Sequence, residues 1–277
     1  MRDLDDVDFE IKLLLETIYH KFRSDFRSYS PASMRRRLTL AIARFGIPSI
    51  SQLQDQLLTN PDLYDRLLSY LTVPTSEMFR DPSYFLCLRK EVLPILATYP
   101  SLKIWIAGCS TGEELYTMAI MLKEEGLLSR SIIYATDINP KSLAAAEDGY
   151  FRAEEIPKFT KNYQAAGGKF AFSDYYEVVS DRVVFNPELK AGVVFADHSL
   201  ATDSVFAEVQ LVSCRNVLIY FNRELQDRAF ELFRDSIGYR GFLGIGSKES
   251  IRFSSVHGAF DDFSAREKIY RKRAVGG

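Results

Sequence analysis

The stretch KIWIAGCSTGEELYTMAI, Lys103–Ile120, predicts a buried strand, a glycine turn and a helix. The turn, Gly108 to Gly112, fits two kinds of chemistry. Its pattern, G-x-S-x-G, is typical of a nucleophile elbow, the turn that exposes the catalytic serine of a hydrolase. A strand–glycine–helix junction is equally typical of a cofactor site at the first strand–helix turn of a parallel sheet. The rest of the chain has to distinguish the two.

The composition predicts a two-domain protein without a metal site. The chain has 277 residues, of which 47% are hydrophobic and 13% aromatic, enough for one large core or two smaller ones. Its longest apolar runs span only a few residues, and acidic residues follow Met1, so we expect neither a membrane span nor a secretory signal. Three cysteines without a C-x-x-C pair and three histidines argue against disulfides and zinc. We expect a soluble cytoplasmic protein.

The charge is unevenly distributed, although the net charge of −2 gives no nucleic-acid signature. Residues 21–44 contain one acidic residue, Asp25, and seven basic residues: Lys21, Arg23, Arg27, Arg35, Arg36, Arg37 and Arg44. Such a run is either a solvated helix face or a docking surface for an acidic partner.

The first 75 residues or so are predicted to be helical. Apolar residues recur at helical spacing in two groups: Ile11, Leu14, Leu15, Ile18, Tyr19 and Phe22, then Met34, Leu38, Ala41, Ile42 and Phe45. Ser30-Pro31, Asn60-Pro61 and Asp81-Pro82 each place a capping side chain before a proline, which is typical of a helix start. We expect a small bundle with its arginines outside.

After Ser101 the pattern alternates between strands and helices, which predicts a parallel α/β sheet. The expected strands lie within 102–108, 131–137, 192–200, 209–221, 241–247 and 268–273, and the expected helices within 113–125, 140–148 and 222–237. Residues 169–186 interrupt this alternation with three short aromatic and β-branched runs. These predict a small antiparallel insertion.

A hydrolase is disfavoured by what surrounds the glycine turn. A nucleophile elbow normally follows several strands, but here only helices precede it. A triad on Ser110 would need one of the two later histidines. His198 directly follows an aspartate and His257 lies in a polar loop. Neither position supports a catalytic triad with Ser110.

A cofactor site accounts for more residues. Gly108 and Gly112 would let the backbone approach a ligand, and the next strand ends in Asp137, whose carboxylate can accept hydrogen bonds from both ribose hydroxyls. Asp137 could instead cap the following helix. The acidic pair Glu113 and Glu114 would repel a pyrophosphate and suits a cationic ligand such as S-adenosylmethionine.

Six segments in order resemble the chemoreceptor protein-glutamate O-methyltransferases, the CheR family. They are TSEMFRDPSYF (75–85), WIAGCSTGEELYT (105–117), ATDINPKSLAAAEDGYF (135–151), VVFADHSLATD (193–203), SCRNVLIYFNRELQ (213–226) and GFLGIGSKES (241–250). The resemblance covers nearly the whole chain.

The resemblance implies a class I S-adenosylmethionine-dependent methyltransferase fold, α/β with a Rossmann-like seven-stranded sheet. It implies an N-terminal all-helical domain, residues 1–75, and a linker and helix over 76–100 that contribute to the active site. The methyltransferase domain would then span 101–277, with the three-stranded antiparallel β insertion at about 168–187.

The resemblance also implies site residues. Glu114 would hold the methionine end of the cofactor and Asp137 the ribose. The other cofactor positions would be Ser76, Arg80, Gly108, Ser199, Leu200, Arg215 and Asn216, with Ser199 and Leu200 near adenine and Arg215 and Asn216 at the amino-acid end. Arg80 and Tyr220 would face the transferring methyl group. Many members carry asparagine at the positions of Pro74 and Ser199 and threonine at that of Ser76. Arg80 as a surface arginine, Tyr220 as a core tyrosine and Asn216 as a strand-end cap are the structural alternatives.

The implied reaction is methyl transfer from S-adenosylmethionine to glutamate carboxylates of chemoreceptors, giving methyl esters that tune sensory adaptation. Arg35, Arg36 and Arg37 would dock the acidic cytoplasmic helical bundle of a receptor, and a peptide strand could add to the edge of the antiparallel insertion. We expect a monomer that binds no nucleic acid and does not insert into the membrane. The alternatives are a methyltransferase for another acceptor and a receptor-docking scaffold that binds the cofactor without turnover.

Overall fold

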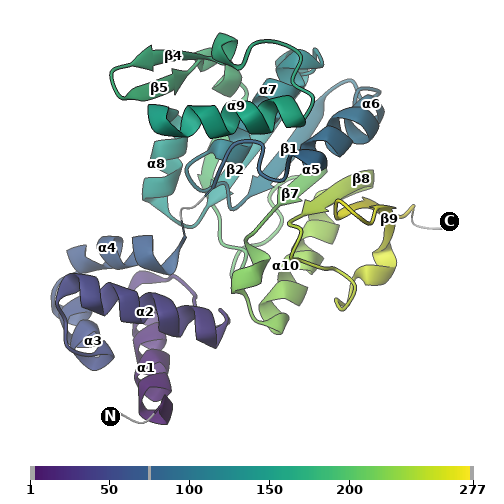
Figure 1. Cartoon of the computed structure of the whole chain (residues 1–277). Helices are drawn as coiled ribbons and strands as arrows, with labels where there is room; N and C mark the ends of the chain where they lie inside the picture. Colours follow the sequence, from purple (N-terminus) through teal and green to yellow (C-terminus); the bar gives the residue numbers. More distant parts are fainter. Residues whose placement is uncertain (1–3, 74–75, 275–277) are drawn as a thin grey trace. The chain divides into compact units, whose positions relative to one another are not determined.

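The computed structural model describes residues 4–73 and 76–274 (Figure 1). Within these ranges, no helix is long and apolar enough to cross a bilayer. The chain forms two compact units. The first, the helical unit, comprises Met1–Pro74, Leu200–Asp203 and Ile219–Ala229. The second comprises Thr75–Ser199, Ser204–Leu218 and Phe230–Gly277, and is called the methyltransferase unit after the domain that the resemblance predicts.

Residues 4–73 of the helical unit form four helices, in agreement with the helical character that the apolar spacing predicted. They are α1 (Leu4–Phe22), α2 (Pro31–Phe45), α3 (Ile50–Thr59) and α4 (Asp62–Leu71). Pro31 begins α2 and Gly46 ends it in the left-handed conformation, at φ +69°. The Ser49 hydroxyl caps α3 by accepting from the Gln52 amide at 3.2 Å. The unit also takes in residues 219–229, where Tyr29 and Phe221 form an isolated antiparallel bridge.

The methyltransferase unit contains a seven-stranded sheet in the order β6-β2-β1-β7-β8-β10-β9, which confirms the predicted class I fold. The strands are β1 (Leu102–Ala107), β2 (Ser131–Asp137), β6 (Val193–Asp197), β7 (Val209–Cys214), β8 (Ile237–Ile245), β9 (Phe260–Ser264) and β10 (Ile269–Lys272). Strands β6, β2, β1, β7 and β8 are parallel, and β10 is antiparallel to both β8 and β9. The order reverses between β1 and β7, so the carboxyl ends of these strands form the expected ligand-binding edge.

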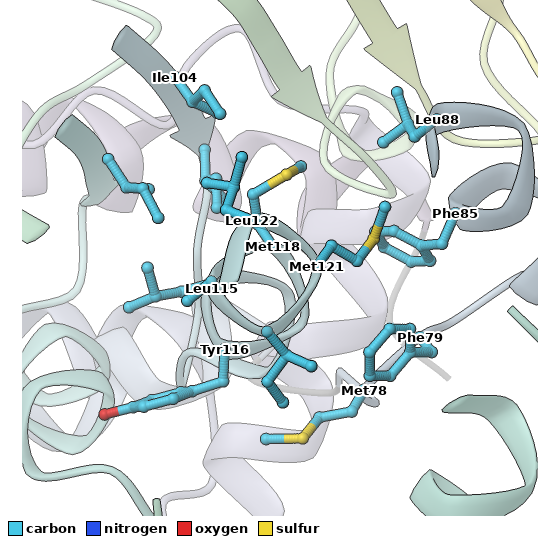
Figure 2. Packing of buried hydrophobic residues seen from close by; sticks show 14 of the residues in the cluster. Met78, Phe79, Phe85, Leu88, Ile104, Leu115, Tyr116, Met118, Met121 and Leu122 are labelled. Atoms are coloured by element: carbon cyan, nitrogen blue, oxygen red, sulfur yellow. The ribbon is translucent and has the colours of Figure 1, made fainter. Parts of the chain in front are cut away.

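Alternating side chains of β1 face two different layers. Ile104 belongs to the core beside α7 (Glu113–Glu124), and Figure 2 shows it with Leu115 and Leu122 of that helix. Trp105 points to the opposite layer, where it contacts Phe233 of α10 (Arg223–Ser236) at 5.5 Å between ring centroids. This two-sided burial is the reason why β1 reads as a continuous apolar run.

The segment predicted as a linker, residues 76–100, packs into the core of the methyltransferase unit. It contains α5 (Pro82–Cys87), a π-helical turn (Leu88–Val92) and α6 (Leu93–Leu96). Met78 and Phe79 are fully buried, and Figure 2 shows them with Phe85 beside α7.

The antiparallel insertion is present, but its boundaries differ from the prediction. Its three strands, in the order β3-β5-β4, are β3 (Tyr150–Arg152), β4 (Tyr176–Val179) and β5 (Arg182–Phe185), with α8 (Pro140–Asp148) before them and α9 (Ile156–Ala165) after β3. The first strand therefore lies before α9 instead of after residue 168. In a strand, the side chains of Phe170 and Phe172 would point to the same face. Phe170 is instead 63% exposed while Phe172 is buried, because the chain forms a short 3-10 helix over Phe172–Tyr175.

Candidate active site

The turn after β1 can be built only with glycine at its two ends. Gly108 and Gly112 have φ of +74° and +99°. A Cβ atom on Gly108 would lie 2.5 Å from the Val217 side chain, and one on Gly112 would lie 3.0 Å from Ala146. Ser110 between them also has a positive φ, +52°, which is costly for a residue with a side chain.

Four of the five backbone amides of this turn, those of Gly108, Cys109, Ser110 and Gly112, are bonded within the protein. Cys109 donates to the Thr136 carbonyl at 2.9 Å, and Gly112 donates to the Cys109 carbonyl at 3.0 Å. Ser110 donates to Asp137 Oδ2 at 2.9 Å. A phosphate cradle needs free amides pointing at the ligand. This turn is therefore unsuited to phosphate, as its acidic flank predicted.

Asp137 ends β2 and fixes the turn from the side. Besides the Ser110 amide, its other oxygen accepts from the Asn139 amide at 3.0 Å. The helix α8 is capped by Asn139, whose Oδ1 accepts from Lys141 at 3.0 Å, so Asp137 is not the cap. Burial raises the pKa of the Asp137 carboxyl, against the lowering effect of the amide bonds. The Ile138 amide is a third donor that lowers this pKa. A carboxylate has about four acceptor positions, so at least one remains for a ribose hydroxyl.

The alternative of a serine nucleophile fails on geometry. The buried Ser110 hydroxyl has no hydrogen-bond partner within residues 4–73 and 76–274. His198 Nε2 lies 3.2 Å from the Ser204 carbonyl oxygen, and its ring packs edge-on against Trp105. A nucleophilic serine needs a base within hydrogen-bond reach, and no described histidine makes that contact.

Glu114 and Arg215 meet between α7 and the end of β7. The Ser213 hydroxyl donates to Glu114 Oε1 at 2.6 Å, and Arg215 Nη1 lies 3.4 Å from Glu114 Oε2. Arg215 Nη2 donates at 2.8 Å both to the Arg80 carbonyl oxygen and to Asp81 Oδ2. The Arg215 side chain is 1% exposed. The structure thus brings together three predicted residues, Arg80, Glu114 and Arg215, in one buried cluster.

Aromatic groups complete the surroundings of Arg215. Its guanidinium carbon lies 4.2 Å from the ring centroid of Tyr84 and 5.0 Å from that of Phe85. The Tyr84 hydroxyl lies 3.0 Å from Ser213 Oγ, and burial raises the pKa of Tyr84. Arg215 is therefore held by charge and by stacking at once.

Two acidic residues of the site were not predicted from the sequence. Asp81 was expected to cap α5, but its side chain makes no cap hydrogen bond and pairs with Arg215. Glu249, buried after β8, accepts from the amides of Asn216 at 3.2 Å and Gly246 at 2.6 Å. Asn216 has a φ of +62°, so Glu249 holds it in a turn. The two residues lie 33 positions apart in the sequence, and no local pattern links them.

Glu113, the neighbour of Glu114, is hydrogen-bonded to a residue of the turn itself. The Thr111 hydroxyl lies 2.8 Å and 2.9 Å from its two carboxylate oxygens, and burial raises the pKa of Glu113. Together with Glu114 and Asp137, it makes the turn electronegative. This environment fits the cationic sulfonium and ammonium of S-adenosylmethionine.

The remaining predicted residues are placed as follows. Ser76 and Ser199 are partly exposed parts of the methyltransferase unit, and Pro74 lies outside the described residues. Leu200 and Tyr220 belong to the helical unit. There the Tyr220 carbonyl accepts from the Ser30 amide at 2.8 Å.

The prediction that the α2 arginines all lie outside is wrong for Arg37. It is 4% exposed, its guanidinium carbon lies 4.1 Å from the ring centroid of Tyr220, and it donates to the Leu71 carbonyl. Arg36 is exposed, and Arg35 is partly exposed and paired with Asp8. The apolar spacing contained the signal, because Arg37 is three residues after Met34 on the buried face of α2.

Comparison with known proteins extends over both units. Residues 74–269 match the family described as "CheR methyltransferase, SAM binding domain", and residues 10–72 match "CheR methyltransferase, all-alpha domain". The chain belongs to the CheR methyltransferase family. Its first matched domain, by that description, binds S-adenosylmethionine, so this CheR-family protein is an S-adenosylmethionine-dependent methyltransferase.

Relatives support the same assignment. The chain is 53% identical over 267 residues to Cher3 of Pseudomonas putida, a methyltransferase by name, covering 96% of this chain and 98% of the relative. It is 30% identical to a chemotaxis protein methyltransferase of Listeria innocua, covering 82% and 84% of the two chains. Among solved structures, the N-methyltransferase NodS from Bradyrhizobium japonicum, in complex with S-adenosyl-L-homocysteine, matches at a TM-score of 0.34 and 13% identity, over 61% of this chain and 62% of the other.

Proposed function

We propose that this CheR-family protein transfers a methyl group from S-adenosylmethionine to glutamate side chains of chemoreceptors. Relatives named chemotaxis protein methyltransferase support the pathway. The substrate class is inferred from Arg80. It lies at the edge of the cluster around Arg215, and its guanidinium forms no hydrogen bond or ion pair with the described residues. An available arginine beside an electronegative turn suits an acceptor that carries its own carboxylate.

A glutamate acceptor also explains why no base is needed. Its unperturbed pKa is about 4.3, so the side chain is already ionised at neutral pH. S-adenosylmethionine supplies the methyl group, whose bond to sulfur breaks as the bond to the carboxylate oxygen forms, with the electron pair left on sulfur. Arg80 would hold one carboxylate oxygen and leave the other free to attack. Its role is orientation, because a grip on both oxygens would weaken the nucleophile.

The cofactor would be held by residues at the carboxyl ends of the strands. Asp137 would accept from the ribose hydroxyls, and Glu114, with Arg215 and Asn216, would line the amino-acid end. Gly108 would contribute its backbone only, because the space for a Cβ there is filled by the Val217 side chain. Ser76, Ser199 and Leu200 are further proposed contacts, and Tyr220 would shape the path of the methyl group.

Receptor docking is proposed for Arg35 and Arg36 on α2. Arg36 is exposed, and α2 has no acidic residue in its first turn to offset it. The partner would be the acidic helical bundle of a chemoreceptor in the cytoplasm. A second docking surface is strand β4, an edge of the insertion on which Val178 and Val179 are exposed.

The test is methyl transfer to a purified receptor cytoplasmic fragment with methyl-labelled S-adenosylmethionine. A glutamate ester releases labelled methanol in alkali, whereas an N-methyl product keeps its label. We expect the methyl label to be lost in alkali. We also expect Arg80→Ala to incorporate much less label than the wild-type chain. An alkali-stable product would assign another acceptor, and binding of S-adenosylhomocysteine by calorimetry without any label would assign a scaffold.

A further inference from the structure

The backbone around Arg80 is held in an unfavourable conformation. Phe79 and Asp81, the two neighbours of Arg80, have φ of +53° and +56°. Neither is glycine, and side chains rarely adopt this region unless the surroundings impose it. Such strain tends to lie at functional sites. The contacts that impose it therefore indicate what fixes Arg80.

On the amino-terminal side, the loop is fixed by the core. The Phe79 amide donates to the Thr117 hydroxyl on α7 at 2.9 Å, and Asn162 Nδ2 donates to the Met78 carbonyl at 3.0 Å. The buried Phe79 ring packs edge-on against Phe85 and other aromatic rings. These contacts hold the residues before Arg80, but none of them reaches Arg80 itself.

On the carboxyl-terminal side, the loop is fixed by one arginine. Arg215 Nη2 donates to the Arg80 carbonyl and to the Asp81 carboxylate, each at 2.8 Å. Arg215 has little freedom, since its side chain is buried, bonded to Glu114 and stacked on Tyr84. One nitrogen of a rigid side chain thus binds both the peptide of Arg80 and its neighbour.

Among residues 4–73 and 76–274, Arg215 is the hydrogen-bonding and ion-pair partner of the Asp81 carboxylate. Asp81 stands at the amino end of α5, yet its carboxylate caps no helix amide. A cap on this helix would bond to an amide two or three residues ahead. Instead the carboxylate supplies the charge opposite Arg215, and it is 40% exposed.

We infer that Asp81 is a positioning residue, which acts with Arg215 to hold the strained loop so that Arg80 presents its guanidinium to the acceptor carboxylate. The inference rests on the proposed function and names a further residue of the same site. It also gives Arg215 a second role besides the proposed contact with the cofactor. Loss of the Asp81 charge would let the loop relax, and Arg80 would lose its fixed orientation.

The kinetic test uses Asp81→Asn, which keeps the shape of the side chain and removes its charge. We expect kcat/KM for the receptor fragment to fall about 10-fold to 100-fold, as for a displaced catalytic group. Calorimetry should show a smaller fall in S-adenosylhomocysteine affinity, because Arg215 keeps its contacts with Glu114 and the Arg80 carbonyl. Asp261→Asn, which disrupts an exposed pair with Arg273 at 2.7 Å, is the matched control and should change neither value. Unchanged turnover in Asp81→Asn would overturn the inference.

A second measurement separates positioning from general loss of structure. In an Arg80→Lys background, Asp81→Asn should lower kcat/KM by a much smaller factor than in the wild-type chain, because the group that Asp81 positions is already altered. If the two substitutions instead lowered kcat/KM independently, so that their effects on the activation free energy added in full, the inference would be overturned.

Hydrogen–deuterium exchange of residues 78–84 gives an answer that does not depend on the acceptor. We expect faster exchange in Asp81→Asn at the Tyr84 amide, which donates to the Asp81 carbonyl. Unchanged exchange would refute the positioning role of Asp81 even if the wild-type chain methylates glutamate. Conversely, faster exchange in a chain that yields no alkali-labile label would reject the proposed function and retain the positioning role.

Discussion

Arg215 and Arg37 are both buried arginines stacked on tyrosine rings, one in each unit of the protein. Arg215 ends a strand of the methyltransferase sheet and bonds to Glu114, Asp81 and the Arg80 carbonyl. Arg37 lies in the middle of α2, over Tyr220, and bonds to the Leu71 carbonyl. The sequence predicted the first as a site residue and the second, wrongly, as a surface residue. The difference lies in how each prediction was made.

Arg215 was predicted from a motif that follows a buried strand, and a strand fixes where its end lies. Arg37 was predicted from a run of like charges, which says nothing about direction. Neighbouring helix residues point about 100° apart, so three consecutive arginines cannot share one environment. A charge run therefore predicts a surface only for those members that lie off the apolar stripe.

The largest effect is expected at the strand ends, from Asp137→Ala. Two hydrogen bonds from the ribose to a charged group would be lost, which should weaken S-adenosylhomocysteine binding about 100-fold or more. The bond to the Ser110 amide would be lost as well. Titration calorimetry measures the affinity, with Asp261→Asn as the control. An affinity in Asp137→Ala that matches the wild-type value would contradict the proposed contact with the ribose.

The next effect sharpens the contrast within α2. Arg37→Ala removes a buried stacked cation and leaves the Leu71 carbonyl without its donor, which should lower the free energy of unfolding by about 2–3 kcal/mol. Arg36→Ala removes an exposed side chain and should stay within about 0.5 kcal/mol of wild type. Urea unfolding followed by circular dichroism compares the two variants. Equal losses would mean that the burial of Arg37 contributes little.

Much of the methyltransferase unit was predictable from the sequence because its central strands, such as β1 and β7, are buried on both faces. The runs predicted at 102–108 and 131–137 are the strands β1 and β2, and the proposed site residues follow or end these strands. The strand β9 was missed, because the acidic residues in FDDFS hide its pattern. The strand β3 was missed because it has only three residues.

The residues of the candidate site that the sequence did not predict were missed for a different reason. Asp81 precedes a proline, so local rules predict a cap, but Arg215 lies 134 residues away and attracts the carboxylate instead. Glu249 binds the turn at Asn216 through a contact that is equally remote in sequence. Residues at the end of a strand can be predicted from the local sequence. The residues that support them cannot, because their positions depend on tertiary contacts.

A smaller effect tests docking on α2. Arg36→Glu reverses an exposed charge and should raise KM for the receptor fragment about fivefold at low salt, without changing kcat, because charge steers association. The effect should shrink as salt is added. Arg266→Glu is the control, since Arg266 is a highly exposed arginine of the methyltransferase unit. An equal rise in KM for both variants would assign the effect to net charge instead of to α2.

The smallest effect concerns protonation at the strand end. Burial, together with the neighbouring Asp197, raises the pKa of the Asp137 carboxyl above the usual 3.8, and the amides of Asn139 and Ser110 offset this in part. Above its pKa the carboxylate accepts from every donor around it; below the pKa one oxygen carries a proton and that acceptor is lost. Affinity for S-adenosylhomocysteine should therefore fall a few-fold as the pH drops from neutral toward the raised pKa.

Asp137→Asn cannot titrate in this range, so its affinity should be weaker but flat with pH. A slope that persists in Asp137→Asn would place the titrating group elsewhere, for example on Glu113, whose pKa burial also raises. Calorimetry across this range therefore distinguishes the strand-end carboxylate from the turn carboxylate as the group whose charge the cofactor requires.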